Sequence, residues 1–530
     1  MQRLVLPSCL VLGLALGFSA ACGAPGPLSE EERNFTSDVA TLLVMDFDAQ
    51  LVSSTAQNPQ GQIRAQLLYT VGHLNAEPGV SRLDKLNLSN VTVTPAGGGL
   101  WRIRYHVKLP VAWGHQDQLP TQYTFTLPLR LDLAGQQAFL AKYSPACTEH
   151  EGAQVSVDNL WYHYRPHDPA CTLQAADVMV ARATAQVSTL NTMGKFPEFH
   201  KVWEDGQLNV VAVFGKYASG ATGADDAGIA AYNAFAAAIH AELNAWPAGI
   251  PDVPGAAHPE VTVRAGNVNV TMLLVDGMRE TSPAWDKRFA ELTPGADLIL
   301  YNGHAGLGAN VAALVQKGSF FPGKYQILFL DGCDTFAYAD DTMARRRASL
   351  NPDDGAGTKY LDVIANAMPA YFSSMPDASM ALLRALRHPE TPLTYPQIFK
   401  GVNPAHVVVV TGEEDNVFTR ATAILPRWHA VNEEAFVGKG ESVLYTADLA
   451  AGTYVFATTP DPSIAGGDAD LRVRAGAMPT QDQTYKCQSY VGNSNERCKL
   501  TLAAPARVHV TVTGDAAGTQ SHFILKGWSL

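Results

Sequence analysis

The sequence predicts a multidomain protein with a β-rich N-terminal domain, a central α/β domain with a mainly parallel sheet, and a C-terminal β-sandwich. Three observations lead to this expectation. A chain of 530 residues has room for about three to four domains at roughly 150 residues each. Alternating, β-rich runs dominate both ends of the chain. Between them, short and continuously apolar runs alternate with helix-period segments, which is typical of a parallel sheet covered on both faces.

Residues 1–22 have the pattern of a secretory signal peptide. Arg3 is followed by an apolar run and then by small residues before Cys22, so we expect an exported protein. Cys22 resembles the lipidated cysteine of bacterial lipoproteins, and ordinary signal cleavage near the same place is the alternative. Residues 23–35 would be a tether, so that contact with a membrane is expected only through a lipid anchor at the cell envelope; otherwise the protein is secreted.

Residues 36–200 are predicted to form the β-rich N-terminal domain. Its strongest strand signals are the runs 100–111, 122–133 and 155–166. Aromatic side chains crowd the last run, and we expect them to pack against the core. The domain shows little chemistry, so the sequence gives it no function.

Residues 205–425 are predicted to form the α/β domain. Its strands are expected in the runs 208–214, 268–275, 297–303, 325–330 and 405–410. Helical spacing predicts a helix over residues 225–243, where two aspartates at the start suit the helix dipole. Further helices are expected over residues 285–292, 359–368 and 378–387.

Residues 439–530 are predicted to form a small β-sandwich. The order of GTYVFATT, GGDADLRVRAGAMPT, YKCQSYVGNSNERCKLTL and ARVHVTVTG resembles the bacterial pre-peptidase C-terminal (PPC) domain, a module appended to secreted peptidases. The resemblance implies an exported and often proteolytic protein, and it brings no catalytic residue. Asp468 and Asp470 are candidate ligands for a calcium ion in this sandwich; no cofactor is otherwise expected.

The cysteine count singles out Cys333. Of seven cysteines, Cys9 would leave with the signal peptide and Cys22 would carry the lipid. Two pairs lie close in sequence, Cys147 with Cys171 and Cys487 with Cys498, and an oxidising compartment favours disulfides between them. This arithmetic predicts that Cys333 has no partner, either as a buried inert residue or as a reactive thiol.

His304 and Cys333 are the candidate catalytic residues. Each follows an apolar run predicted as a strand, and 333 − 304 = 29 residues separate them. This spacing fits a crossover between neighbouring parallel strands, whose carboxyl ends meet at one edge of the sheet. A thiolate nucleophile needs an imidazole for the leaving-group proton and backbone N–H groups for the oxyanion. The amides of Ala305 and Gly306 are the oxyanion candidates.

An apolar strand ending in a His motif, followed by an apolar strand ending in a small residue and Cys, resembles clan CD, the caspases, legumains, gingipains and separases. The resemblance covers residues 208–418. It implies that His304 handles the proton and that Cys333 is the nucleophile of a cysteine-type endopeptidase. Ala305 departs from the glycine of the clan, and positive φ at this position would strain an alanine.

Asp331 is the candidate for the substrate pocket. Strand alternation places it on the same side of the sheet as Cys333, and an acid there would favour cleavage after Arg or Lys. Asp276 and residues 413–415 are expected to make the electrostatic potential at the same edge of the sheet more negative. Solvated loop positions are the alternative for each acid.

A polar stretch over residues 339–359 is predicted to form a loop after Cys333. Arg345, Arg346 and Arg347 within it are a candidate self-processing site, and a solvated charged loop is the alternative. Metal-ligand spacings such as HExxH or CxxC do not occur, so no metal site is expected there.

These observations favour an exported hydrolase, a cysteine endopeptidase acting on a protein or peptide substrate. The alternative is a non-catalytic surface lipoprotein whose β domains bind polymer or protein. The net charge of −12 and the lack of a long basic run exclude nucleic acid as an expected partner.

Overall fold

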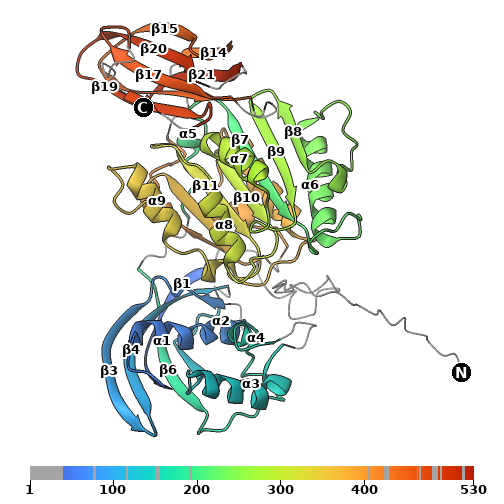
Figure 1. The fold of residues 1–530 in the computed structure, drawn as a ribbon, viewed down its shortest axis with the longest axis vertical. Helices are drawn as coiled ribbons and strands as arrows, with labels where there is room; N and C mark the ends of the chain where they lie inside the picture. Colours follow the sequence, from blue (N-terminus) through green and yellow to red (C-terminus); the bar gives the residue numbers. More distant parts are fainter. Residues whose placement is uncertain are drawn as a thin grey trace, which may run out of the picture.

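The computed structural model describes residues 40–75, 79–114, 117–149, 155–189, 194–403, 406–422, 424, 429–461, 464, 467–479, 487–489, 492–515 and 520–530. The predicted signal peptide, Cys22 and the tether lie outside these residues. The described chain forms four sheets in three regions, with the central region between the other two (Figure 1). Among the described helices, none combines the length and the apolar character needed to cross a membrane.

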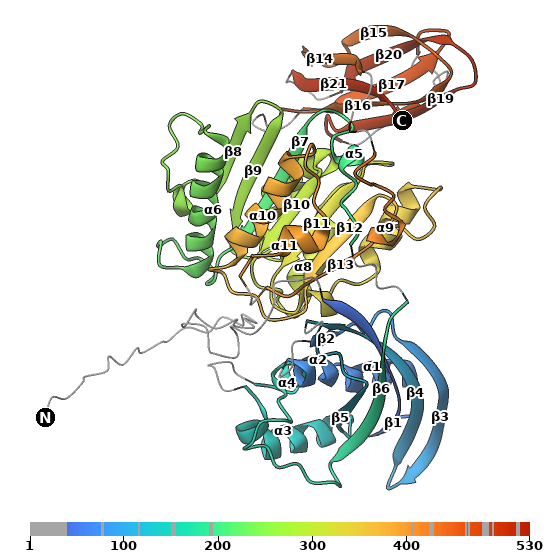
Figure 2. The same ribbon diagram turned by 180° about the vertical axis from the view of Figure 1, so that it is seen from behind.

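The N-terminal region is a six-stranded antiparallel sheet with helices on one face (Figure 2). The strand order is β2-β4-β1-β6-β5, and β3 pairs with β4. The strands are β1 (Thr41–Ser53), β2 (Gly79–Ser81), β3 (Asn87–Gly97), β4 (Leu100–Trp113), β5 (Gln122–Pro128) and β6 (Val178–Val187). The helices are α1 (Pro59–Leu67), α2 (Tyr69–Leu74), α3 (Leu133–Cys147) and α4 (Leu160–His163).

Two expectations for this region are corrected. Residues 155–166 form a turn and the short helix α4 instead of a strand, although Tyr164 is buried in the core as expected. The helix α3 follows β5 directly, where the sequence analysis continued the strand to residue 133. Asp132 begins this helix, because its side chain accepts a hydrogen bond from the amide of Gly135, 3.1 Å away.

The central region is a seven-stranded sheet in the order β13-β12-β11-β10-β7-β9-β8. The five strands β12, β11, β10, β7 and β9 are parallel, and the two edge strands are antiparallel to their neighbours. The strands are β7 (Leu208–Gly215), β8 (Glu260–Ala265), β9 (Val268–Val275), β10 (Leu298–Asn302), β11 (Gln326–Asp331), β12 (Leu361–Asn366) and β13 (Val408–Thr411).

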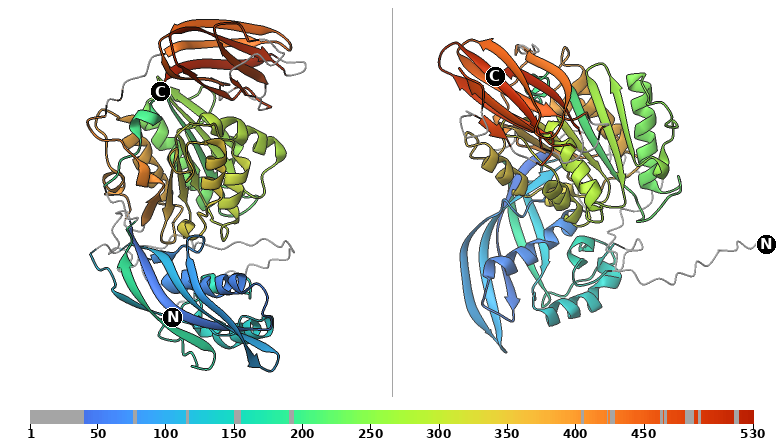
Figure 3. Two further views of the ribbon diagram at one scale, coloured as in Figure 1. Left: turned by 90° about the vertical axis from the view of Figure 1, so that its left-hand side faces the viewer. Right: turned by 45° about the horizontal axis from the view of Figure 1, so that its top comes forward.

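Helices cover both faces of this sheet (Figure 3). They are α5 (Phe199–Val202), α6 (Ala227–Leu243), α7 (Pro283–Leu292), α8 (Ala309–Lys317), α9 (Thr342–Leu350), α10 (Met375–Arg387) and α11 (Tyr395–Phe399), and two 3-10 turns are η4 (Thr335–Ala337) and η5 (Glu413–Asp415). Side chains of α6 and α10 pack on one face, and those of α7 and α8 pack on the other. The predicted helix over residues 359–368 is wrong, because this apolar segment is β12 and lies between β11 and β13.

The C-terminal region consists of two four-stranded antiparallel sheets, β14-β21-β16-β19 and β15-β20-β17-β18, with a shared apolar core. The strands are β14 (His429–Val437), β15 (Ser442–Leu449), β16 (Gly452–Thr459), β17 (Ala469–Ala475), β18 (Cys487–Ser489), β19 (Glu496–Leu502), β20 (Ala506–Gly514) and β21 (Ser521–Ser529). The alternating pattern of the sequence thus produces a two-sheet sandwich.

Candidate functional site

His304 and Cys333 follow two adjacent parallel strands in register. Asn302 of β10 pairs with Asp331 of β11, and each candidate residue lies two positions after its member of this pair. The amide of Gly303 donates a hydrogen bond to the carbonyl of Asp331 at 3.0 Å. A Cβ atom at Gly332 would lie 2.5 Å from the carbonyl oxygen of Gly303, so the two chain segments are in direct contact. The sheet therefore brings the two predicted residues to one edge.

The His304 ring is held by residues from two further strand ends. Its Nε2 atom lies 3.1 Å from the carbonyl oxygen of Tyr217, which follows β7. The rings of Tyr217 and Phe372 lie 5.2 and 5.1 Å from the imidazole ring, and Phe372 follows β12. The Nδ1 atom is buried with no hydrogen-bond partner in the described part of the chain. An Nε2–H donated to Tyr217 leaves Nδ1 as the proton acceptor.

Asp226 supports this arrangement from the start of α6. Its carboxylate accepts hydrogen bonds from the amides of Tyr217 and Ala218, 3.0 and 2.8 Å away, and it also caps the helix. Burial lowers the pKa of His304, while the Tyr217 carbonyl and the charge of Asp226 raise it, and the net shift is downward. A lowered pKa keeps the imidazole neutral and able to take a proton.

Cys333 lies beside the segment that follows β12. Its Sγ atom is 3.5 Å from the carbonyl oxygen of Ala370, two residues before Phe372. The residue is 3% exposed. The sulfur is assigned to a disulfide, and its partner lies outside the described residues. The prediction that Cys333 has no partner is therefore wrong, and thiolate chemistry at this position requires that the disulfide be reduced.

The oxyanion candidates adopt an unstrained backbone. Gly306 has φ of +60°, whereas Ala305 is not among the described non-glycine residues with positive φ. Alanine at position 305 is thus compatible with the fold. The following turn is closed by the carbonyl of Ala305, which accepts from the amide of Gly308 at 3.1 Å.

Asp331 does not line an open substrate pocket. It is 0% exposed, and its Oδ1 atom accepts from Asn366 at 2.7 Å and lies 2.9 Å from Nε2 of His406. Strand alternation places it on the expected face, but the ends of β12 and β13 bury it. The prediction of a pocket for a basic side chain is corrected accordingly.

A row of buried polar residues lies beneath the site, and of these only Asp331 was predicted to belong to it. Asn302, Asp331 and Asn366 end three neighbouring strands, and all three are almost fully buried. Ser379 of α10 donates to Asn302 at 2.8 Å. The signal was present as a polar residue after each apolar run, but the segment that ends in Asn366 was interpreted as a helix.

The predicted acidic rim is divided between two edges of the sheet. Asp276 follows β9 at the edge of the candidate site, where Lys216 pairs with it at 2.8 Å. Glu413, Glu414 and Asp415 form η5 after β13, and β13 runs antiparallel. These three acids therefore lie at the opposite edge, contrary to the prediction.

The predicted self-processing loop is helix α9. Arg347 is fully buried and donates to Gln326 at 3.0 Å and to the carbonyl of Tyr360 at 2.9 Å. Arg346 donates to the carbonyl of Val315 at 2.6 Å, and Arg345 is exposed. Since a peptidase needs an extended and accessible segment, this structure contradicts the self-processing hypothesis.

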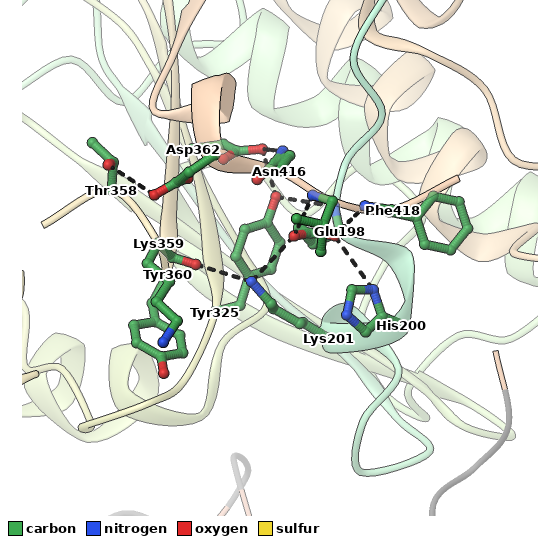
Figure 4. Close-up of polar contacts among 12 residues, drawn as sticks. Glu198, His200, Lys201, Tyr325, Thr358, Lys359, Tyr360, Asp362, Asn416 and Phe418 are labelled. Atoms are coloured by element: carbon green, nitrogen blue, oxygen red, sulfur yellow. Dashed lines mark hydrogen bonds and ion pairs between the residues drawn. The ribbon is translucent and has the colours of Figure 1, made fainter. Parts of the chain in front are cut away.

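A second buried polar cluster lies at the amino ends of β11 and β12 (Figure 4). Asp362 accepts from Tyr325 at 2.5 Å and from Asn416 at 2.7 Å, and burial raises its pKa to about 7. Glu198 accepts from the amides of Val417 and Phe418, each at 2.9 Å. This cluster fastens the segment after β13 to α5, at the edge opposite to the candidate site.

Both predicted disulfides are present, between Cys147 and Cys171 and between Cys487 and Cys498. They fit a protein from an oxidising compartment. Within the described ranges, no group of three His, Cys, Asp or Glu side chains is arranged to hold a metal ion. Asp470 of the calcium candidates lies 3.4 Å from Arg472.

Comparisons with known proteins give no family. No family model matches the chain, and no curated protein matches it. Among solved structures, the pre-Peptidase C-terminal Domain of Collagenase from Bacillus anthracis matches at 12% identity and a TM-score of 0.15, over 18% of this chain and 88% of that one. A family GH115 4-O-Methyl-alpha-glucuronidase matches at 8% identity and a TM-score of 0.15, over 36% of this chain and 32% of that one. CapF, the capsular polysaccharide assembling protein from Staphylococcus aureus, matches at 10% identity and a TM-score of 0.12, over 50% of this chain and 89% of that one. Likenesses at these scores carry no argument about function.

Proposed function

We propose that the chain is an exported cysteine endopeptidase with a caspase-like central domain, a PPC-like sandwich and, in the form with reduced Cys333, a lipid anchor at Cys22. The observation that supports this proposal most is the register of β10 and β11, which sets His304 and Cys333 side by side at the carboxyl edge of the sheet. The Tyr217 carbonyl, 3.1 Å from Nε2 of His304, favours the tautomer that accepts a proton at Nδ1.

The reaction proposed for this site is acyl transfer. The reduced Cys333 gives its proton to His304, and the thiolate attacks the carbonyl carbon of the peptide bond. A C–S bond forms, the C–N bond breaks, and His304 delivers the proton to the leaving amine. Water activated by His304 then attacks the thioester, which releases the acid and restores the thiol. The amide of Ala305 would donate to the oxyanion.

The substrate is proposed as a peptide bond without a preference for the preceding residue. The argument for Arg or Lys rested on Asp331, which is buried and hydrogen-bonded to Asn366. An acid in such a position stabilises the strand ends.

One observation favours a second candidate function, a non-catalytic surface protein. The sulfur of Cys333 is assigned to a disulfide, and a cysteine in a permanent disulfide cannot act as a nucleophile. In this case the polar strand ends have a structural role, and the flanking β regions would bind polymer or protein.

Hydrolysis of a peptide library separates the two candidates. Mature protein is assayed with and without a reductant, together with Cys333→Ala and His304→Ala. The exposed His388 provides the matched control His388→Ala. The peptidase proposal expects reductant-dependent turnover that is lost in both site variants and kept in the control. Equal turnover in all four proteins, or none after reduction of Cys333 has been verified by mass spectrometry, contradicts it.

A further inference from the structure

A cavity of about 680 Å³ lies between the N-terminal region and the central sheet. Leu42 and Val44 of β1 form one wall, and Leu330 of β11, Val363 of β12 and Ala312 of α8 form the other. The volume falls within the roughly 300–1,000 Å³ of small-molecule sites, which are mostly apolar with few polar groups. Apolar side chains form the larger part of the lining, and charged and polar side chains form the rest.

Val363 lies on a part of the sheet that faces the cavity. It lies in the middle of β12, with β11 and β13 on its two sides, yet it is only half-buried. Its neighbour Ile364 points to the other face and is 0% exposed. Ala312 of α8 is exposed although it also lines the cavity. An apolar occupant would bury these side chains and gain roughly 25 cal/mol for each Å² removed from water.

The charged side chains of the lining indicate whether the occupant should carry a negative or a positive charge. Arg82 is paired with Asp84 at 2.9 Å, and Lys85 is paired with Asp341. The ammonium group of Lys108 lies 3.8 Å from the carboxylate of Asp46, which also contacts His106 at 3.1 Å. The Lys108 side chain is 56% exposed at the mouth of the cavity. Lys108 is therefore the lining cation best able to take an additional anion.

The anions of the lining have closer contacts within their own segments. Asp340 accepts from the amide of Thr342 at 2.9 Å, and Glu414 accepts from the amide of Gly412 at 2.8 Å. Each of these carboxylates already accepts a hydrogen bond from a backbone amide. A cationic head group would therefore stabilise them less than an anionic head group would stabilise Lys108.

We propose that this cavity binds a fatty acyl ligand, with the chain against Leu330, Val363 and Ala312 and the anionic head group at Lys108. The aliphatic walls suit a flexible hydrocarbon chain, and the exposed ammonium suits a carboxylate. The site is independent of the proposed peptidase activity.

The occupant would touch the segment that follows Cys333. Phe336, Tyr338 and Ala339 belong to the cavity lining, together with residues of β1 and β4. A bound acyl chain would therefore bridge the N-terminal region and this segment, and we expect it to raise the unfolding temperature of the protein by mass action.

The test is a titration of the mature protein with the fluorescent fatty acid cis-parinaric acid. We expect saturable binding that lauric acid displaces and dodecylamine does not. The variant Ala312→Phe fills the cavity and should weaken binding at least tenfold. Its matched control is Ala237→Phe, which changes an exposed alanine on helix α6 outside the cavity. Lys108→Glu should weaken binding about three- to tenfold, and Lys499→Glu, on an exposed position of β19, should leave it unchanged.

A photoactivatable diazirine analogue of palmitic acid gives a readout that does not depend on the folding of a variant. Mapping of the crosslinks on the wild-type protein should place them in the segments that line the cavity, which are β1, β4, α8, β11, β12, α9 and residues 336–341. Crosslinks confined to other segments overturn the proposal, as does equal binding by Ala312→Phe and Ala237→Phe. If dodecylamine displaces the probe as strongly as lauric acid does, the proposal that the ligand has an anionic head group is wrong. Loss of peptide hydrolysis in Cys333→Ala leaves all these results unaffected.

Discussion

The two boundaries of the central region are built from different interactions. At the boundary with the sandwich, Glu204 and Lys324 meet Arg497 and Lys526, and all four are at most 7% exposed. The Arg497 guanidinium lies 3.1 Å from Glu204 and stacks over the Trp528 ring. Burial lowers the pKa of Lys324, but the attraction of Asp297, Asp205 and Glu204 outweighs this effect and the net shift is upward.

At the boundary with the N-terminal region, apolar packing is combined with a partly exposed ion pair. Ala40, Val71 and Val80 belong to the same buried cluster as side chains of the central sheet, and Lys85 pairs with Asp341. Asn75 donates to Asp334 at 3.2 Å, and the ring of Trp161 lies 6.4 Å from that of Tyr338. The cavity of about 680 Å³ lies at this boundary. Buried ion pairs fix a single geometry because a lost partner leaves an uncompensated charge. The sandwich boundary is thus held by buried charges, whereas the N-terminal boundary combines apolar packing, a more exposed ion pair and a cavity, and lies next to Cys333.

The largest effect is expected at the boundary with the sandwich. Arg497→Met leaves Glu204 buried without its closest partner, so the free energy of unfolding should fall by about 3–5 kcal/mol. Arg507→Met removes an exposed ion pair with Asp448 in the same sandwich and serves as the control. Chemical denaturation measures the free energy of unfolding of both variants. Equal losses in the two variants would contradict a fastened sandwich.

At the N-terminal boundary, stability should depend on pH through Asp334. Burial raises its pKa from 3.8 to about 6, against hydrogen bonding from Asn75. The protonated form is therefore favoured in the folded state; its contribution is complete below about pH 4 and is lost as the pH rises through 6. Relative to Asp334→Asn, the wild type should lose roughly 2 kcal/mol between pH 4 and pH 7.5. A difference between the two proteins that stays constant with pH in denaturation experiments refutes this assignment.

Asn75→Ala should have a smaller effect at the same boundary. Loss of the amide leaves the Asp334 carboxyl with one hydrogen bond fewer, which should cost about 1 kcal/mol and raise the pKa of Asp334 further above its ordinary value. The measurement is the pH of the Asp334-dependent stability change. If Asn75→Ala leaves that pH unchanged, the N-terminal region does not control Asp334.

The smallest expected effect concerns the candidate site between the two boundaries. Asp226→Ser keeps a cap for α6 but removes the charge that raises the pKa of His304. The acid limb of the pH profile of kcat/KM should move to lower pH. Asp225→Ser, at the exposed neighbouring position, makes the same change of charge and should cause a smaller shift. Identical profiles for the two variants would argue against a specific effect of Asp226.

Much of the fold followed from local patterns. The apolar runs at 208–214 and 325–330 are strands, and the helical spacing at 225–243 produces α6. Both disulfides could be predicted because their cysteines lie close in sequence. The segment 359–368 was wrongly predicted as a helix, since a short apolar run fits a buried strand and a buried helix equally well.

The candidate site was only partly predictable. The adjacency of His304 and Cys333 followed from strand order, which loop length restricts. The sequence pattern does not show whether β13 runs parallel or antiparallel to its neighbour. The acids at 413–415 were therefore predicted at the wrong edge of the sheet. The burial of Asp331 depends on Asn366 and His406, which arrive from strands further along the chain.

The most direct test of the proposed dyad is the alkylation rate of Cys333 as a function of pH. After selective reduction, iodoacetamide labelling of this cysteine is followed by peptide mass spectrometry in the wild type and in His304→Gln. The account predicts that the wild-type thiol, whose proton the neutral His304 can accept, is alkylated faster near neutral pH than the thiol of the variant. The same pH profile in both proteins would contradict an imidazole–thiol pair and with it the proposed peptidase.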